Sequence, residues 1–167
     1  MKSKLMIAAL LLSFLACTQK QPDQFTQQQK DQIKSDLRVV LDSIIATSLR
    51  LDANAGLQFY WDSPDFLAIN TDGSQSDYQA LKKMGSEGVK TIATMTMSTS
   101  RADFSVLTKD IAVCTWIGKG VVTFKSGDIM TYGPDALTLI FRNFDGKWKI
   151  TYSHESATIV TKKAGKK

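Results

Sequence analysis

Apolar residues recur at helical spacing in the first long patterned segment of the chain. Between Ile33 and Leu49 they return every three or four positions, while charged residues fall mostly between them. A period of about 3.6 residues predicts an amphipathic helix with one buried face. Thr26 and Gln29 have the spacing of a capping box, which indicates the start of this helix. Gly56, in a run of small and polar residues, favours a stop before it.

Three shorter elements are predicted after this helix. They are a short helix over residues 57–61, a strand over 66–70 and a third helix over 77–84. Ser76 and Gln79 repeat the capping-box spacing and mark the expected start of the third helix. Gly85 and Gly88 are expected to loosen its end.

From Ile92 onward the apolar pattern changes to the two-residue period of strands. Threonine, valine, isoleucine and aromatic residues become frequent, and turn signals interrupt them at intervals. Strands are predicted over residues 92–107, 111–124, 129–143 and 147–160. Asp145-Gly146 is a strong hairpin signal because both residues tolerate positive φ. Gly133-Pro134 interrupts the third of these strands and predicts a bulge or a late start there.

These elements predict an α+β fold. Long neighbouring strands joined by tight turns form an antiparallel sheet that must curve to cover its apolar face. Because the helices come first, we expect a cone-shaped, curved antiparallel sheet wrapped around three N-terminal helices. The predicted domain covers residues 29–160, and a basic tail covers residues 161–167.

The first residues of the chain have the layout of a bacterial secretory signal. Lys2 and Lys4 precede an apolar run from Leu5 to Leu12, and Ala16 stands directly before Cys17. The run is too short for a membrane span, which needs about 20 residues. A small residue before a cysteine is typical of a signal that ends in a lipid-modified cysteine. An ordinary cleaved signal, in which Cys17 has no special role, is the alternative.

We therefore predict a lipoprotein of the bacterial cell envelope. Residues 1–16 are the signal peptide, Cys17 carries palmitate or a similar acyl chain, and residues 17–28 include a polar tether. The membrane is thus the first expected partner. Thr18 follows the cysteine where an aspartate would favour the inner membrane, so the outer membrane is expected. With Cys17 modified, Cys114 has no intrachain partner and is predicted to be a small buried apolar residue.

The positive charge of the chain is confined to its ends. The formal charge is +5, but Lys2 and Lys4 belong to the signal and the tail holds four more lysines, which leaves the middle close to −1. No nucleic-acid motif accompanies these lysines, so nucleic acid is excluded as a partner. The tail is expected to be solvated, or alternatively to contact anionic lipid head groups.

His154 is the single histidine of the chain, so a histidine-cluster metal site is excluded. We expect no metal and no cofactor. Strict alternation along the last strand places His154 on the same face as Trp148 and Ile150, which is the core face. His154 could there transfer a proton or donate a hydrogen bond to a ligand. A buried neutral imidazole satisfied by a carbonyl or hydroxyl is the alternative.

The order of the elements and the last hairpin resemble a known family. Residues 138–156 read as a threonine and apolar strand, a glycine turn, Trp148-Lys149-Ile150, and then His154 and Ser156 two positions apart. This pattern resembles the nuclear transport factor 2-like fold, and in particular its SnoaL-like branch. The likeness covers about residues 30–160 and implies an open conical pocket inside the curved sheet. It does not imply one function, because the family holds enzymes and binding modules.

Candidate pocket residues lie on several elements. The predicted ligand-binding residues are Tyr60, Trp61, Tyr78, Trp116, Thr138, Tyr152 and His154. Packing in the core is the alternative role for each aromatic residue. Enzymes of the resembling family use a pocket aspartate, for which Asp65, Asp72 and Asp135 are the candidates here. Their positions near the ends of elements are also typical of surface turns.

The sequence thus predicts a lipid-anchored envelope module that binds a small apolar molecule or a protein partner in its pocket. The alternative is an envelope enzyme of the isomerase or dehydratase type that uses His154 in acid–base chemistry. A third hypothesis is a structural homodimer whose pocket is vestigial. A homodimer through the face of the sheet is expected, with the stripe Thr94–Ser100 as one part of that face.

Overall fold

The computed structural model describes residues 25–165 of the 167-residue chain. The predicted signal peptide, the predicted lipidation site Cys17 and most of the tether lie outside the described residues. Within the part that is described, no helix has both the length and the apolar character that crossing a bilayer demands.

The long predicted helix is confirmed as α1, Gln27–Leu49. It begins with the predicted capping box: the Gln29 N–H donates to Thr26 Oγ1 at 3.2 Å, and the Thr26 N–H donates to Gln29 Oε1 at 2.8 Å. The next helix, α2, covers Ala53–Leu57, so the predicted helix over residues 57–61 is wrong: it overlaps α2 only at Leu57, and a turn and an isolated bridge from Tyr60 to Ile150 follow. Asp52 is the reason for the earlier start, because its side chain accepts the N–H of Ala55 and caps this helix.

The third helix, α3, covers Tyr78–Thr91 and continues through both of its glycines. The prediction that Ser76 caps it is wrong. Asp77 is the cap, and its carboxylate accepts the N–H of Ala80 at 2.7 Å. Ser76 belongs instead to a short strand, and its hydroxyl accepts a hydrogen bond from Asn70 Nδ2.

Six strands form one curved sheet in the order β2-β1-β6-β5-β4-β3. Their bounds are β1 Leu67–Ile69, β2 Gln75–Ser76, β3 Ile92–Thr108, β4 Ile111–Phe124, β5 Ile129–Phe144 and β6 Lys147–Lys162. The four long strands are antiparallel, as predicted, whereas β1 joins β6 in parallel. Asp145 and Gly146 both have positive φ, which confirms the predicted tight turn between β5 and β6.

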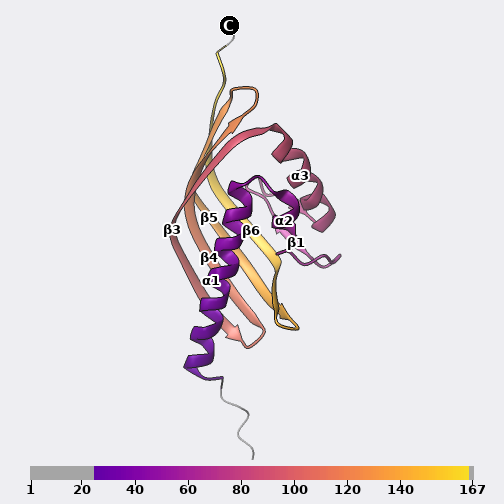
Figure 1. Ribbon diagram of the computed structural model, residues 1–167, viewed down its shortest axis with the longest axis vertical. Helices are drawn as coiled ribbons and strands as arrows, with labels where there is room; N and C mark the ends of the chain where they lie inside the picture. The colour runs from indigo at the N-terminus through magenta and orange to yellow at the C-terminus, as the bar shows by residue number, and fades with distance from the viewer. Residues whose placement is uncertain (1–24, 166–167) are drawn as a thin grey trace, which may run out of the picture.

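The sheet bends around α1, which lies along its concave side (Figure 1). Side chains of α1, β1, β4, β5 and β6 meet there in one buried core. The largest fully buried members of this core are Leu37, Phe66, Trp116, Leu139, Phe141 and Ile150. The α+β cone that the sequence predicts is therefore the observed fold.

Two bulges interrupt the pairing of β5 with β6. The first lies in β5 between Tyr132 and Asp135, at the predicted interruption by Gly133-Pro134. The second lies in β6, where Ile150 and Tyr152 pair with the adjacent residues Phe141 and Ile140 of β5 and leave Thr151 as the extra residue. An extra residue in one strand shifts every later side chain to the opposite face of the sheet.

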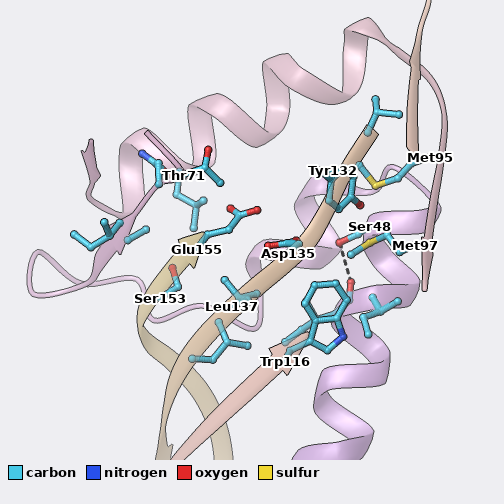
Figure 2. A pocket seen from close by; sticks show the side chains of 18 of the residues that line it. Ser48, Thr71, Met95, Met97, Trp116, Tyr132, Asp135, Leu137, Ser153 and Glu155 are labelled. Atoms are coloured by element: carbon cyan, nitrogen blue, oxygen red, sulfur yellow. Dashed lines mark hydrogen bonds between the residues drawn. The ribbon is translucent and has the colours of Figure 1, made fainter. Parts of the chain in front are cut away.

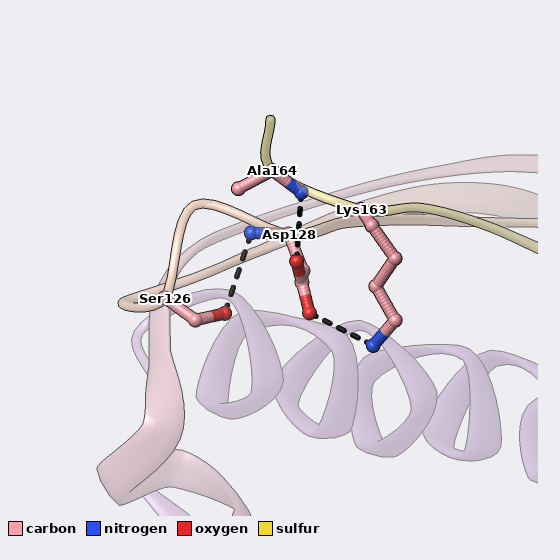
Figure 3. A network of polar contacts seen from close by, with 4 residues as sticks. All are labelled: Ser126, Asp128, Lys163 and Ala164. Carbon is pink, nitrogen blue, oxygen red and sulfur yellow. Dashed lines mark hydrogen bonds and ion pairs between the residues drawn. The ribbon is translucent and has the colours of Figure 1, made fainter. Parts of the chain in front are cut away.

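The end of β6 is attached to the neighbouring hairpin (Figure 3). The Asp128 carboxylate accepts the N–H of Ala164 at 2.8 Å and pairs with Lys163 Nζ at 3.0 Å. The strand itself runs to Lys162, so the predicted tail boundary at residue 161 falls inside β6. At least the first part of the predicted tail is thus an ordered piece of the sheet edge.

Candidate functional site

A cavity of about 360 Å³ lies between α1 and the concave side of the sheet. Most of its wall is apolar. The helix contributes Leu41, Ile44 and Ile45, and the sheet contributes Met95, Met97, Trp116, Leu137 and Leu139. Exposed Thr71 lies at its rim. The volume falls at the small end of the range of about 300–1,000 Å³ that is usual for ligand pockets.

Two carboxyl groups interrupt this apolar wall. Glu155 of β6 pairs in register with Leu137 of β5, and Asp135 is two residues before Leu137. The two acids are therefore diagonal neighbours on adjacent strands, and both line the cavity. Figure 2 shows their carboxyl groups directed toward the same part of the cavity, with Met97 and Trp116 along another wall.

Burial changes the chemistry of both acids. Only 3% of Asp135 is exposed, and its Oδ1 has no hydrogen-bond partner. Removal from water disfavours the charged form, so the pKa of Asp135 is raised above its ordinary value. The pKa of Glu155 is also raised, first by burial and then by the negative charge of Asp135. Two such groups can hold a proton that isolated carboxyls would lose.

Two tyrosines add neutral hydroxyl groups to the same cavity. Burial, with a contribution from the charges of Asp135 and Glu155, raises the pKa of Tyr132 to about 12. Burial and the charge of Glu155 likewise raise the pKa of Tyr60 to about 12. Both hydroxyls stay protonated at neutral pH, so neither adds charge to the cavity.

Two glycines of β4 make room for the aromatic part of the wall. A Cβ atom on Gly118 would collide with the ring of Trp116, and one on Gly120 would collide with the phenol of Tyr132. Gly118 is also the cross-strand partner of Asp135. The absence of side chains at these positions lets both rings lie flat along the sheet.

The structure brings two of the predicted ligand-binding residues into the cavity wall. Tyr60 and Trp116 both line it, and the Trp116 indole donates a hydrogen bond to Thr99 Oγ1 at 2.8 Å. Trp116 is 2% exposed, so it also belongs to the core. Both proposed roles of this residue, pocket wall and core packing, therefore hold for its position.

The other predicted aromatic residues of the N-terminal half lie outside the cavity wall. Trp61 stacks on Phe144 with ring centroids 5.3 Å apart. Tyr78 packs edge-on against Phe66 at 6.3 Å. Neither contributes to the lining. These two residues pack against other aromatic side chains and do not shape the cavity.

The prediction that His154 faces the core is wrong. Its side chain is exposed on the outer face of the sheet, and Thr138 is its cross-strand partner there. Tyr152 lies on the same face. The cause is the bulge at Thr151, which reverses the alternation that holds for Trp148 and Ile150. Thr138, Tyr152 and His154 are neighbours as expected, but none of them lines the cavity.

The same bulge turns Ser153 and Glu155 toward the cavity. Strict alternation had assigned both residues to the outer face of the sheet. Of the three aspartates considered, Asp135 is the one that lies in the cavity. Asp65 is exposed, and Asp72 is an exposed turn residue that accepts hydrogen bonds from Ser74.

Neither a metal site nor a reactive thiol is found among the described residues. Across residues 25–165, no cluster of three or more His, Cys, Asp or Glu side chains is arranged to bind a metal ion. Cys114 is fully buried, as predicted, and burial raises the pKa of its thiol to about 11.

Comparison with known proteins places this geometry in a wider group. The model of the SnoaL-like domain family matches residues 38–160. No curated protein matches the chain.

Solved structures with the same fold share little sequence with it. A proposed scytalone dehydratase from Novosphingobium aromaticivorans has a TM-score of 0.71 at 10% identity, over 85% of this chain and 94% of that one. A hexachlorocyclohexane dehydrochlorinase of type 2 has a TM-score of 0.69 at 6% identity, over 81% and 93%. A nuclear transport factor 2-like superfamily protein from Salmonella enterica has a TM-score of 0.66 at 16% identity, over 76% and 92%. At such identities the likeness establishes the fold alone.

Proposed function

We propose that this chain, which belongs to the SnoaL-like domain family whose model matches most of it, binds a small, mainly apolar molecule in the cavity between α1 and the sheet. The single observation that supports this function is the cavity of about 360 Å³ with a largely apolar wall. Burying apolar ligand surface there is favourable by about 25 cal/mol per Å². The wall is formed by regular elements, so the site exists before a ligand arrives.

Mass spectrometry under native conditions tests this function on the protein purified from its own host. The wild type is expected to retain a small molecule. Met97→Trp fills the cavity and should abolish retention, because Met97 lines it. Ser98→Trp is the matched control, since Ser98 is exposed on the next position of the same strand. Equal retention by both variants would contradict the proposal.

The same experiment decides the role of the histidine. His154→Ala should leave retention unchanged, because the exposed imidazole lies on the outer face of the sheet. Loss of the bound molecule in this variant would place the binding site outside the cavity. The sequence-based hypothesis that His154 binds the ligand would then be restored.

A second candidate function is acid–base catalysis by Asp135. The specific observation is a buried carboxyl with a raised pKa and an unpartnered oxygen in the cavity, which is typical of a catalytic acid or base. Structures compared above include a proposed dehydratase and a dehydrochlorinase. Turnover of a panel of β-hydroxy ketones, followed by the absorbance of the enone product, tests this function. Activity should be lost in Asp135→Asn and kept in His154→Ala, and the reverse result would refute it.

We propose further that the protein is attached to the bacterial cell envelope through lipid on Cys17. The support comes from the sequence, where a short apolar signal ends in Ala16-Cys17. Outer-membrane attachment is the expected location. Cells fed labelled palmitate should incorporate it into the wild type and not into Cys17→Ser. Incorporation into the variant would rule out this anchor.

The outer face of the sheet is the surface for which we propose self-association. Half-buried apolar side chains form a cross-strand row there, in which Val113 pairs with Ile140 and Ile140 pairs with Tyr152. An apolar row on one sheet face suits a second copy of the same face. Analytical ultracentrifugation should show a dimer for the wild type and a monomer for Ile140→Lys. A monomeric wild type at high concentration would contradict this.

A further inference from the structure

The polar end of the cavity carries two acids and no balancing cation. No lysine, arginine or histidine lines the cavity, within the part of the chain that the structure describes. Asp135 and Glu155 lie on adjacent strands and face the same space. A fully ionised pair would place two negative charges in a mainly apolar enclosure, which is costly unless a positive charge joins them.

The unsatisfied oxygen of Asp135 points to a missing hydrogen-bond donor. Only 3% of the surface of Asp135 is exposed, and its Oδ1 accepts no hydrogen bond from the protein. Buried polar atoms of folded proteins are almost always paired. A donor on a molecule bound in the cavity would satisfy this oxygen.

On the basis of the proposed binding function, we infer that the ligand is an apolar amine whose protonated nitrogen sits between Asp135 and Glu155. An ammonium group has three N–H donors, so one nitrogen can serve both carboxylates. A single hydroxyl has one donor and would leave the second acid unpaired. The nitrogen would offset one of the two negative charges of the pair and donate a hydrogen bond to each acid, while the apolar body of the ligand fills the space beside Met97 and Trp116.

The aromatic wall favours the same class of ligand. Trp116, Tyr132 and Tyr60 all line the cavity, and the faces of such rings attract cations. The two tyrosine hydroxyls are uncharged, so neither supplies the positive charge that the acid pair lacks. The side chains of α1 that face the cavity are Leu41, Ile44, Ile45 and Ser48, which carry no charge.

Three probes that differ only in their head group test this inference. They are adamantylmethylamine, adamantylmethanol and adamantanecarboxylate, titrated into the full chain by isothermal calorimetry. The amine is expected to bind about tenfold more tightly than the alcohol or better, since hydrogen bonds to charged groups are the stronger ones. The carboxylate should bind most weakly because like charges repel.

Variants assign the preference to the two acids. Asp135→Asn and Glu155→Gln should each bring the amine and the alcohol to similar affinity while the alcohol binds as before. Asp42→Asn, an exposed acid on the outer side of α1, is the matched control and should keep the preference. Thermal melts of each variant confirm that it is folded before titration.

The pH dependence gives a second readout. A proton and the amine compete for the pair, so amine affinity should fall as the pH is lowered through the raised pKa range of Asp135 and Glu155. The other titratable groups that face the pair are Tyr132 and Tyr60, and both stay neutral over this range. Affinity of the alcohol should change much less.

The outcomes separate this inference from the function on which it rests. If the alcohol binds as tightly as the amine, and Met97→Trp abolishes both, the amine inference is overturned and the apolar pocket stands. If Asp135→Asn keeps the full amine preference, the inference is likewise overturned. If no probe binds the wild type, the proposed binding function fails and the inference fails with it.

Discussion

Replacing Asp135 by asparagine should stabilise the unliganded protein at neutral and alkaline pH. Asparagine has nearly the same shape as aspartate but cannot carry a charge. In the wild type, 3% exposure and an unpartnered oxygen make the ionised carboxylate unfavourable at this position. The substitution removes the charge and adds two amide N–H donors, from which Glu155 on the adjacent strand is placed to accept a hydrogen bond.

The sign of the effect follows from the direction of the pKa shift. Burial raises the pKa of Asp135 above its ordinary value of 3.8, so the folded protein binds this proton more tightly than the unfolded chain does. The stability of the wild type therefore falls as the pH rises from about 3.8 through the folded pKa, and levels off above it. The asparagine variant lacks this contribution. The difference between the two proteins should be near zero in acid and grow with pH.

The expected size is about 1–2 kcal/mol. An unsatisfied buried polar group costs about 1–3 kcal/mol, and more when it is charged; the variant keeps an oxygen at this position but loses the charge, so part of this cost is relieved. Urea unfolding over a series of pH values measures the difference in the free energy of unfolding, and an unchanged dependence on urea would show that compactness is the same. Adding Glu155→Gln should give less than the sum of the two single effects, because neutralising either acid already relieves the other.

A different pH profile would refute the reasoning. If Asp135→Asn destabilises the protein at about pH 8, the carboxylate makes a favourable contact and its pKa is not raised. If the difference is the same at every pH, the effect is steric and has nothing to do with charge.

Three further results are expected. Gly118→Ala should lower the free energy of unfolding by about 1–3 kcal/mol and shift the fluorescence of Trp116, because the added methyl meets its ring; an unchanged spectrum would contradict this. Asp128→Asn should speed amide hydrogen exchange at Ala164 and lose its effect in acid, because the lowered pKa of Asp128 comes from its bonds to the end of the chain, first the Ala164 amide; exchange at the wild-type rate would show that the contact does not persist in solution. Cys114 should resist thiol reagents until the protein unfolds, because its pKa is about 11 and it is buried; rapid labelling of the folded protein would refute this.

The fold could be predicted from the sequence because its signals are local and repeated. The capping box at Thr26, the turn at Asp145-Gly146 and the break at Gly133-Pro134 each act within a few residues, and the structure confirms all three. The cap of α3 was assigned one residue too early because both Ser76 and Asp77 can cap a helix. Pairing of Ser76 with Asn70 of the preceding strand end decides between them, and a local pattern does not contain that contact.

The cavity was harder to predict because it depends on contacts between distant strands. Trp116 and Tyr60 were identified as large aromatic residues near the expected pocket. Asp135 was named only as a candidate, since nothing in its sequence neighbourhood indicates that burial leaves its oxygen without a partner. The pair Gly118 and Gly120 inside a strand was a usable sign of a close approach, and it would have directed attention to the part of the sheet beside Asp135.

The assignment of faces along β6 failed for a physical reason. Alternation predicts faces only while the strand has no extra residue, and the bulge at Thr151 has no glycine or proline to mark it. Glu155 and His154 therefore exchanged places relative to the prediction.

The bulge at Thr151 also governs how functional roles may be transferred among relatives of this chain. Two sequences aligned without a gap across this strand share columns, yet a relative with regular pairing would direct the column of His154 into its cavity and the column of Glu155 to the solvent. Loss of the single codon for Thr151 would therefore replace the carboxylate of Glu155 by the imidazole of His154 inside the cavity, without altering either residue. In comparative studies of such proteins, where the gap is placed determines which chemistry is assigned to the interior.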